Sequence, residues 1–328
     1  MLIRRGGGVV YATEAVGPGR GGVLQVSHRG GVAPPDAMDR VEAPAMPATI
    51  ELSARSIAAD PDALKLIPEA TRVYLVDGGC EPASEWAQAC RRLVRAGLEP
   101  VPHIACRRIR SLEEIDKRLK AMAEAGRVRD ALVVGGDIAR PAGPFASSMD
   151  LLATGILERH GIRRIGIAGH PEGSPDVAPA AMVDALHRKI EFGVRNGLEV
   201  RLVTQFGFDP EVTIRWTERL AEEGVRLPIH VGVAGPTGMA RLLKYAALCG
   251  VRATASFALK RGAALTSLMG GYSPEPYARA IEKISRIVQL HIYAFGGLPA
   301  TARWLIGRGS WRERDETTQM IQNVRSKP

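Results

Sequence analysis

Eight short β-rich runs alternate with helical patterns along most of the chain, and this alternation is the feature that most limits the fold. The runs cover 49–54, 72–77, 99–105, 130–136, 163–169, 200–206, 228–235 and 289–295. Helical patterns such as SEWAQACRRLVRAG and APAAMVDALHRKIEFGVRNG lie between them. Strands joined through helices pair in parallel. Eight such strands in roughly 250 residues predict an α/β fold, a single (β/α)8 TIM barrel.

An open, doubly wound parallel sheet is the alternative fold. Sheets of that type that bind dinucleotides carry the spacing GxGxxG after the first strand. The glycine-rich run here, VVGGD at 133–137, lacks that spacing. The closed barrel is therefore the favoured prediction.

The first 46 residues differ from the rest, because Gly, Pro and Ala dominate and no apolar period persists. We predict a disordered, low-complexity extension over 1–46, the catalytic barrel over 47–310 and a polar C-terminal tail over 311–328. No run approaches the ~18 consecutive apolar residues of a membrane helix, and the start of the chain lacks the apolar core of a signal peptide. We therefore expect a cytoplasmic protein that does not bind membranes.

The formal net charge of +9 would suit a polyanionic partner. The basic residues are scattered among acidic ones on helical patterns, without interleaved aromatic residues, so nucleic acid is not expected. The four cysteines are widely spaced, and no His, Cys, Asp and Glu group has the local spacing of a metal site. We therefore predict no metal. His230 and His291 lie inside strand patterns and are interpreted as core or rim residues.

Unusual polar residues occur where the predicted strands end, which is where a (β/α)8 barrel has its active site. Glu51 lies within the first run, Asp137 follows the fourth, His170 follows the fifth, and Gln205 and Asp209 end the sixth. A carboxylate in an apolar strand is costly unless it has a partner or a task. A carboxylic acid of raised pKa beside an ionised carboxylate would suit proton transfer.

Three segments, in matching order and spacing, are similar to those of one enzyme family: VVGGDIARPAGPF, IGIAGHPEGSPD and LVTQFGFDPE. The run LHIYAF is similar to the closing strand of that family. From about Thr49 to Phe295 the chain resembles the methylenetetrahydrofolate reductases. The resemblance does not cover the first 46 residues.

The resemblance implies a flavin-dependent oxidoreductase of one-carbon metabolism that interconverts 5,10-methylenetetrahydrofolate and 5-methyltetrahydrofolate. Such an enzyme acts on a CH–NH group, binds folate as substrate, holds FAD and takes electrons from NADH or another donor. It also implies roles for catalytic residues Glu51, Asp137 and Gln205. Glu51 would be the general acid, Asp137 would hydrogen-bond the pterin, and Gln205 would orient it.

The same resemblance implies two sets of binding residues. Those expected to hold the cofactor are His103, Ala105, Val134, Gly135, Gly136, Asp137, Ala168, Gly169, His170, Glu172 and Lys189. Those expected to bind the substrate are Glu51, Asp137, Gln205, Phe206 and Met239.

Several positions depart from the family pattern. Gly135 stands where an Arg is usual, Ala105 replaces a Thr, His170 stands in for a Tyr, and Met239 lies where an aromatic residue commonly stacks. The pterin side of the site is therefore kept better than the flavin side. We expect FAD to bind weakly, and an electron-transfer or methyltransferase protein is a further expected partner. We also expect a homo-oligomer.

Two other functions stay open on the sequence. The chain could be a pterin-binding methyltransferase barrel without redox chemistry, which passes the methyl group of methyltetrahydrofolate to a corrinoid partner. It could also be a non-catalytic relative that acts as a subunit. The TQF and GGD motifs favour the reductase over the methyltransferase. The presence of Glu51, Asp137 and Gln205 together argues against the non-catalytic relative.

Overall fold

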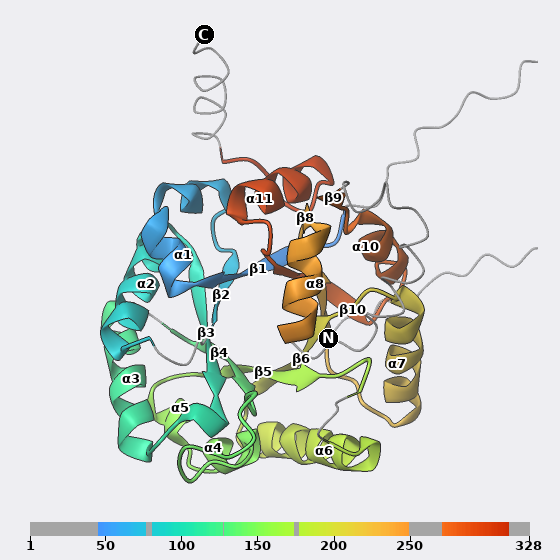
Figure 1. Cartoon of the computed structure of the whole chain (residues 1–328). Coiled ribbons are helices and arrows are strands. Elements are labelled where there is room, and N and C mark those ends of the chain that lie inside the picture. The colour runs from blue at the N-terminus through green and yellow to red at the C-terminus, as the bar shows by residue number, and fades with distance from the viewer. Residues whose placement is uncertain (1–44, 77–80, 127, 174–176, 249–270, 315–328) are drawn as a thin grey trace, which may run out of the picture. The chain divides into compact units, whose positions relative to one another are not determined.

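A computed structural model describes residues 45–76, 81–126, 128–173, 177–248 and 271–314. Eight parallel strands close into a barrel in the order β1-β10-β7-β6-β5-β4-β3-β2, and helices surround them (Figure 1). This confirms the predicted (β/α)8 fold over the open sheet. Nearly all of the extension predicted over 1–46 lies outside the described residues, and so does most of the predicted C-terminal tail.

All eight predicted runs form barrel strands, with ends that move by one or two residues. The strands are β1 (Ala48–Ser53), β2 (Arg72–Val76), β3 (Glu99–Ala105), β4 (Asp130–Val134), β5 (Arg164–Gly169), β6 (Glu199–Phe206), β7 (Ile229–Ala234) and β10 (Ile287–Tyr293). Parallel strands that are covered on both faces read as continuous apolar runs, which is why the sequence identifies them.

The helices that follow the strands carry an apolar face toward the sheet and a polar face toward solvent. They are α1 (Ala54–Ala59), α2 (Ala83–Arg95), α3 (Leu112–Ala125), α4 (Ser148–Leu152), α5 (Ile156–Arg159), α6 (Pro179–Arg195), α7 (Pro210–Glu222), α8 (Met239–Leu248), α10 (Glu275–Ile281) and α11 (Leu298–Gly307), with single 3-10 turns η1 (Asp62–Leu66) and η2 (Cys106–Arg108). A two-stranded antiparallel ladder joins β8 (Thr237–Gly238) to β9 (Gly271–Tyr272). No helix in the described ranges has the length and apolarity needed to cross a membrane.

The interior of the barrel holds a buried charge network near the end where the strands begin. Asp130, the first residue of β4, is 2% exposed, and one of its carboxylate oxygens lies 2.8 Å from Nη2 of Arg201 on β6. Arg201 also donates from Nε and Nη2 to the hydroxyl of Tyr74, at 3.0 and 2.8 Å. Arg72 and Arg164 approach Asp130 at 3.5 Å. Charged groups and a hydroxyl thus fill the end of the barrel where the strands begin. The open volume lies at the opposite end, where the strands finish.

A bulge in β6 shapes that open end. The register between β6 and β7 shifts between Val203 and Phe206. Gly232 faces the bulge, and a Cβ placed there would lie 2.5 Å from the carbonyl oxygen of Thr204. The backbone N–H of Gly232 instead donates to the Thr204 hydroxyl at 2.8 Å. The absence of a side chain at Gly232 therefore lets the strand end that carries Gln205 approach β7 closely.

Candidate active site

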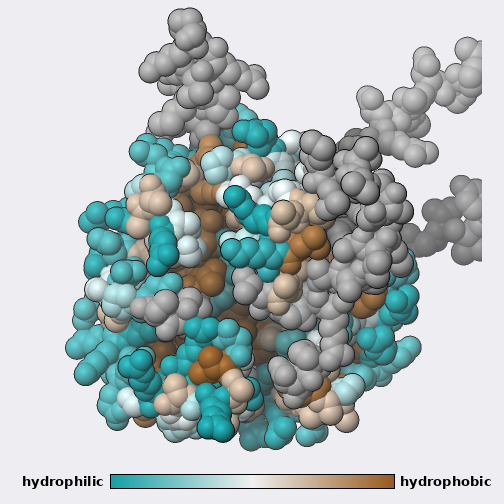
Figure 2. All heavy atoms as spheres, viewed as in Figure 1, coloured by the Kyte–Doolittle hydropathy of each residue, from teal (hydrophilic) through white to brown (hydrophobic). Residues whose placement is uncertain are grey.

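A cavity of about 1260 Å³ opens where the barrel strands end. Apolar residues gather toward the middle of the face shown in Figure 2, and polar residues surround them. The cavity brings together most of the residues expected at the site: Glu51, His103, Ala105, Val134, Gly135, Gly136, Asp137, Ala168, Gly169, His170, Glu172, Lys189, Gln205 and Phe206. Residues from several loops and strands thus converge, as the position of active sites in such barrels requires.

Met239 is not among the residues that line this cavity. It begins α8 and is 7% exposed, packed in a second apolar cluster with Phe206, Phe208 and Leu242. The structure therefore places Met239 in the core next to the cavity wall. Its assignment to the substrate rested on alignment with an aromatic position and stays a prediction.

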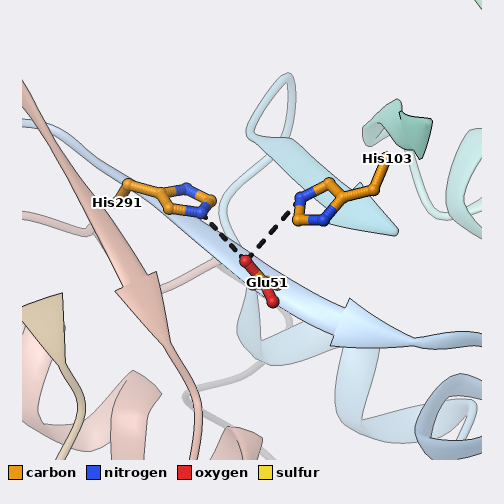
Figure 3. A group of neighbouring side chains, drawn as sticks. All are labelled: Glu51, His103 and His291. Carbon is orange, nitrogen blue, oxygen red and sulfur yellow. Dashed lines mark hydrogen bonds and ion pairs between the residues drawn. The ribbon is translucent and has the colours of Figure 1, made fainter. Parts of the chain in front are cut away.

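Glu51 occupies the centre of the site between two histidines (Figure 3). Its Oε2 atom lies 3.1 Å from Nε2 of His291 and 3.7 Å from Nε2 of His103. The Glu51 side chain is 12% exposed. Burial raises the pKa of this carboxyl above its ordinary value, and the charge on His103 opposes that rise. Glu51 therefore binds a proton more readily than an exposed glutamate does.

The fold brings these three groups together from separate strands. Their ligand atoms lie within 4.8 Å of one another, a spacing that would admit a metal ion. The prediction of no metal considered only residues close in sequence, and it stays a prediction. His291 is fully buried, and burial together with Arg201 lowers its pKa to about 3.

Asp137 has the opposite electrostatic character. The guanidinium of Arg108 binds both carboxylate oxygens, with Nε–Oδ1 at 2.9 Å and Nη2 at 2.6 and 2.8 Å. These hydrogen bonds hold the pKa of Asp137 below its ordinary value. The carboxylate is 70% exposed, so a ligand can reach it. The cavity thus contains a buried carboxyl that favours its acid form and an ionised carboxylate.

Arg108 also bears on the missing cation at Gly135. It comes from η2, directly after β3, and brings a guanidinium to Asp137, two residues beyond Gly135. The neighbouring Arg107 is committed to the backbone, because it donates to the carbonyls of Ala146 and Ile138. The sequence analysis did not predict either arginine as a site residue. The available signal was the run CRR directly after the third strand, where two basic residues follow a strand end.

Gln205 lies on the bulged end of β6, with its amide beside the cavity. Its Oε1 accepts the N–H of Phe206 at 3.1 Å, which leaves the amide NH2 as the group that can donate. The hydroxyl of Tyr293 donates to the Thr204 carbonyl at 3.2 Å and steadies the same turn. Gln205 can thus present hydrogen-bond donors to a ligand in the cavity.

The wall formed by β4 and α6 has features that fit a phosphate-bearing cofactor. Gly136 has φ +97°, a conformation that glycine adopts without strain, and a Cβ at Gly135 would meet no atom within 4 Å. Burial lowers the pKa of the Lys189 ammonium. In the described part of the chain, the groups that act on this pKa are the Cys106 thiol and Arg188, with no carboxylate. A desolvated cation beside open backbone suits an anionic ligand.

Aromatic rings form the wall opposite. Tyr245 and Phe295 are stacked, with ring centroids 4.3 Å apart and planes at 9°, and both line the cavity. Phe206 and Tyr293 meet Phe295 at centroid distances of 5.0 and 5.7 Å. Gly207, where the family has a Phe, leaves space for the Tyr277 hydroxyl, 3.2 Å from the position of an added Cβ. These rings offer flat apolar surface despite the loss of an aromatic residue at Met239.

Comparisons with known proteins point to one family. The family model for methylenetetrahydrofolate reductase matches residues 65–265. A 5,10-methylenetetrahydrofolate reductase of Pectobacterium carotovorum subsp. carotovorum is 30% identical over 161 residues, which is 48% of this chain and 51% of that protein. The protein of that name from Escherichia coli (strain K12) is 28% identical over 164 residues, with the same coverage.

The chain spans about half the length of the curated relatives it matches. Among solved structures, a dihydropteroate synthase from Thermus thermophilus aligns over 85% of this chain and 94% of its own, with 13% identity and a TM-score of 0.43. A likeness of that degree carries no weight here. The family model covers more than half of the sequence, and the chain therefore belongs to the methylenetetrahydrofolate reductase family.

Proposed function

We propose that the protein is an oxidoreductase that interconverts 5,10-methylenetetrahydrofolate and 5-methyltetrahydrofolate. One observation carries the proposal: two carboxyl groups whose pKa values are shifted in opposite directions line the same cavity at the strand ends. Burial raises the pKa of Glu51, whereas the Arg108 guanidinium lowers that of Asp137. Membership of the family supports this substrate.

The chemistry assigns one task to each polar group. In the reducing direction, Glu51 gives its proton to N10 of the substrate, and the bond between N10 and the one-carbon unit breaks. The electron pair of that bond goes to N10, and the one-carbon unit becomes an iminium on N5. A hydride then adds to the iminium carbon, which becomes the N5 methyl group. Asp137 and the Gln205 amide would hydrogen-bond the pterin, so that the carbon faces the hydride donor.

FAD is the cofactor that we propose for this step, because when bound it would supply or accept the hydride. Lys189 would hold its phosphates or ribityl hydroxyls, and the Gly135–Gly136 backbone would approach its ring. NADH or another donor would reduce the flavin. The Tyr245–Phe295 stack is a surface on which a planar donor ring could lie.

An anaerobic titration of the full chain tests the proposal. FAD is added first and 5-methyltetrahydrofolate second, while the visible absorption band of the flavin is recorded. We expect the band to bleach, because oxidation of the methyl group reduces the flavin. Bound folate without bleaching would refute redox chemistry and favour methyl transfer to a corrinoid partner.

A matched pair of variants isolates the role of Glu51. Glu51→Gln keeps the size of the side chain but removes its acid, so we expect folate to bind while the oxidation of reduced FAD by 5,10-methylenetetrahydrofolate slows by about 100-fold or more. Glu199→Gln is the control, because Glu199 is exposed and begins β6, at the end of that strand away from Gln205. Equal rates for the two variants would contradict the assignment of Glu51 as the acid.

Cytoplasmic location, self-association and a protein partner for electrons or methyl groups stay part of this proposal. The +9 net charge is consistent with an anionic folate tail.

A further inference from the structure

We propose that Thr49 and His291 are positioning residues that keep Glu51 in its protonated form between turnovers, through a chain of hydrogen bonds from the Leu290 carbonyl to the Glu51 carboxyl. This inference rests on the proposed function, because it concerns the acid of that reaction. Its structural part can be tested without any folate.

The register of the barrel seam creates the chain. Strands β1 and β10 pair so that Thr49 lies beside His291 and Glu51 lies beside Tyr293. Side chains at alternate positions of a strand share a face, so Thr49 and Glu51 point to the same side of β1. His291 therefore lies between the hydroxyl of Thr49 and the carboxyl of Glu51.

The hydroxyl of Thr49 fixes the direction of the hydrogen bonds. It donates to the Leu290 carbonyl oxygen at 3.2 Å, and its oxygen lies 3.2 Å from Nδ1 of His291. A carbonyl oxygen can only accept, and a hydroxyl has only one proton to donate. Nδ1 must therefore carry the proton of the neutral imidazole and donate it to Thr49.

It follows that Nε2 of the neutral ring has a lone pair directed at Glu51. The Nε2 and Oε2 atoms are 3.1 Å apart, a hydrogen-bond distance, and two lone pairs at that distance need a proton between them. The pair thus holds one proton. Burial disfavours both the imidazolium and the carboxylate, so the proton resides on Glu51, which donates to His291.

The groups around the pair favour the neutral state. The Tyr74 ring meets His291 with centroids 4.3 Å apart, and the Tyr293 ring meets it at 5.1 Å. From β6 and β7, Arg201 lowers the pKa of His291, and His230 is itself held neutral by burial. His103 on β3, 3.7 Å from Glu51, acts in the opposite direction, because its charge lowers the pKa of Glu51.

Loss of the Thr49 hydroxyl should reverse this preference. Nδ1–H would lose its acceptor, and the ring would change to the tautomer whose Nε2–H donates to Glu51. That tautomer stabilises the carboxylate, so Glu51 would lose its proton at lower pH. In Thr49→Val we expect the high-pH limit of kcat/KM to move down by about one pH unit, since a hydrogen bond to a charged group has that magnitude.

The decisive measurement is nitrogen NMR of the full chain labelled with 15N-histidine, with His291→Gln used to assign the signal. We expect His291 in the resting protein to be neutral, with Nδ1 protonated and Nε2 unprotonated. The carboxylic C=O infrared band of Glu51 should be present near neutral pH and should disappear in Glu51→Gln. An imidazolium, a protonated Nε2, or a metal bound at Nε2 would overturn the proposal.

Variants then separate positioning from simple packing. Thr49→Ser keeps the hydroxyl and should restore the pH limit that Thr49→Val displaces. Thr217→Val is the control for loss of a buried hydroxyl, because the Thr217 hydroxyl donates only to the Ile214 carbonyl of its own helix. A Thr49→Val protein whose pH limit and His291 signal stay unchanged would refute the relay. If the signals are as expected but no variant or parent turns over folate, the proposed function fails and the hydrogen-bond chain stands.

Discussion

Removal of Arg201 should cost far more stability than removal of an exposed arginine in the same chain. Arg201 is 6% exposed and its partner Asp130 is 2% exposed, so Arg201→Met leaves a buried carboxylate without its nearest cation. Loss of one partner of a buried pair costs ~3–5 kcal/mol. Arg72 and Arg164 stay 3.5 Å from Asp130 in the variant, so we expect a cost near the lower limit of that range.

Two further contacts add to that cost. Both hydrogen bonds to the Tyr74 hydroxyl are lost, and a buried polar group left unsatisfied costs ~1–3 kcal/mol. These contributions overlap, so we expect about 3–5 kcal/mol in total. The measurement is urea denaturation of the full chain, followed by circular dichroism at fixed pH.

A matched control decides whether burial is the cause. Arg195 is 69% exposed and pairs with Glu191 at 2.5 Å, a short and well-formed ion pair on a helix surface. Arg195→Met should cost no more than ~0.5 kcal/mol. Arg201→Met combined with Asp130→Leu should recover much of the lost stability, because no uncompensated charge remains. Equal costs for the two single variants would refute the reasoning.

Three other predictions concern the site and the residues around it. Gly232→Ala places a methyl group 2.5 Å from the Thr204 carbonyl oxygen and should displace the β6 bulge, which would cost about 1–3 kcal/mol of stability and much of the folate affinity. The control Gly238→Ala meets no atom within 4 Å and should change neither denaturation nor folate binding. Burial lowers the pKa of His230 to about 2, so below pH ~6.5 this residue binds a proton only in the unfolded chain. It should account for about 1 kcal/mol of the stability lost from pH 7 to 5.5, and in denaturation His230→Gln should lose that much less than the parent, while the loss due to His291 remains. Lys189→Met should weaken FAD binding about tenfold or more in a fluorescence titration, and unchanged affinity would remove Lys189 from the cofactor site.

The sequence predicts the barrel well because its strands are short, apolar and separated by amphipathic helices. The segment SMDLLATGILERHG forms two short helices, because α4 ends at Leu152 and Gly155, with a φ of +65°, caps the start of α5. Periodicity alone could not reveal that break, because the apolar face continues across it. The strand-end rule also located the cavity wall, since it depends only on parallel pairing.

The relations between distant residues were beyond sequence reasoning. His291 was interpreted as a core or rim residue, and it is buried, but its contact with Glu51 depends on strand register rather than on any local motif. Arg108 reaches Asp137 from a different loop, 29 positions earlier. Met239 was predicted to bind the substrate from its place in the family pattern, whereas the direction of its side chain depends on how α8 packs. Each of these requires coordinates across the barrel.

The closing seam of the barrel has a consequence for biosynthesis. Contacts between β1 and β10 join residues about 240 positions apart, so the ring can close only after nearly all of the described chain has left the ribosome. Until then, β1 presents an unpaired edge. The Glu51–His291 contact forms across the same seam, so a chain whose seam is open lacks the proposed acid site. Formation of that proposed site is thereby tied to closure of the barrel.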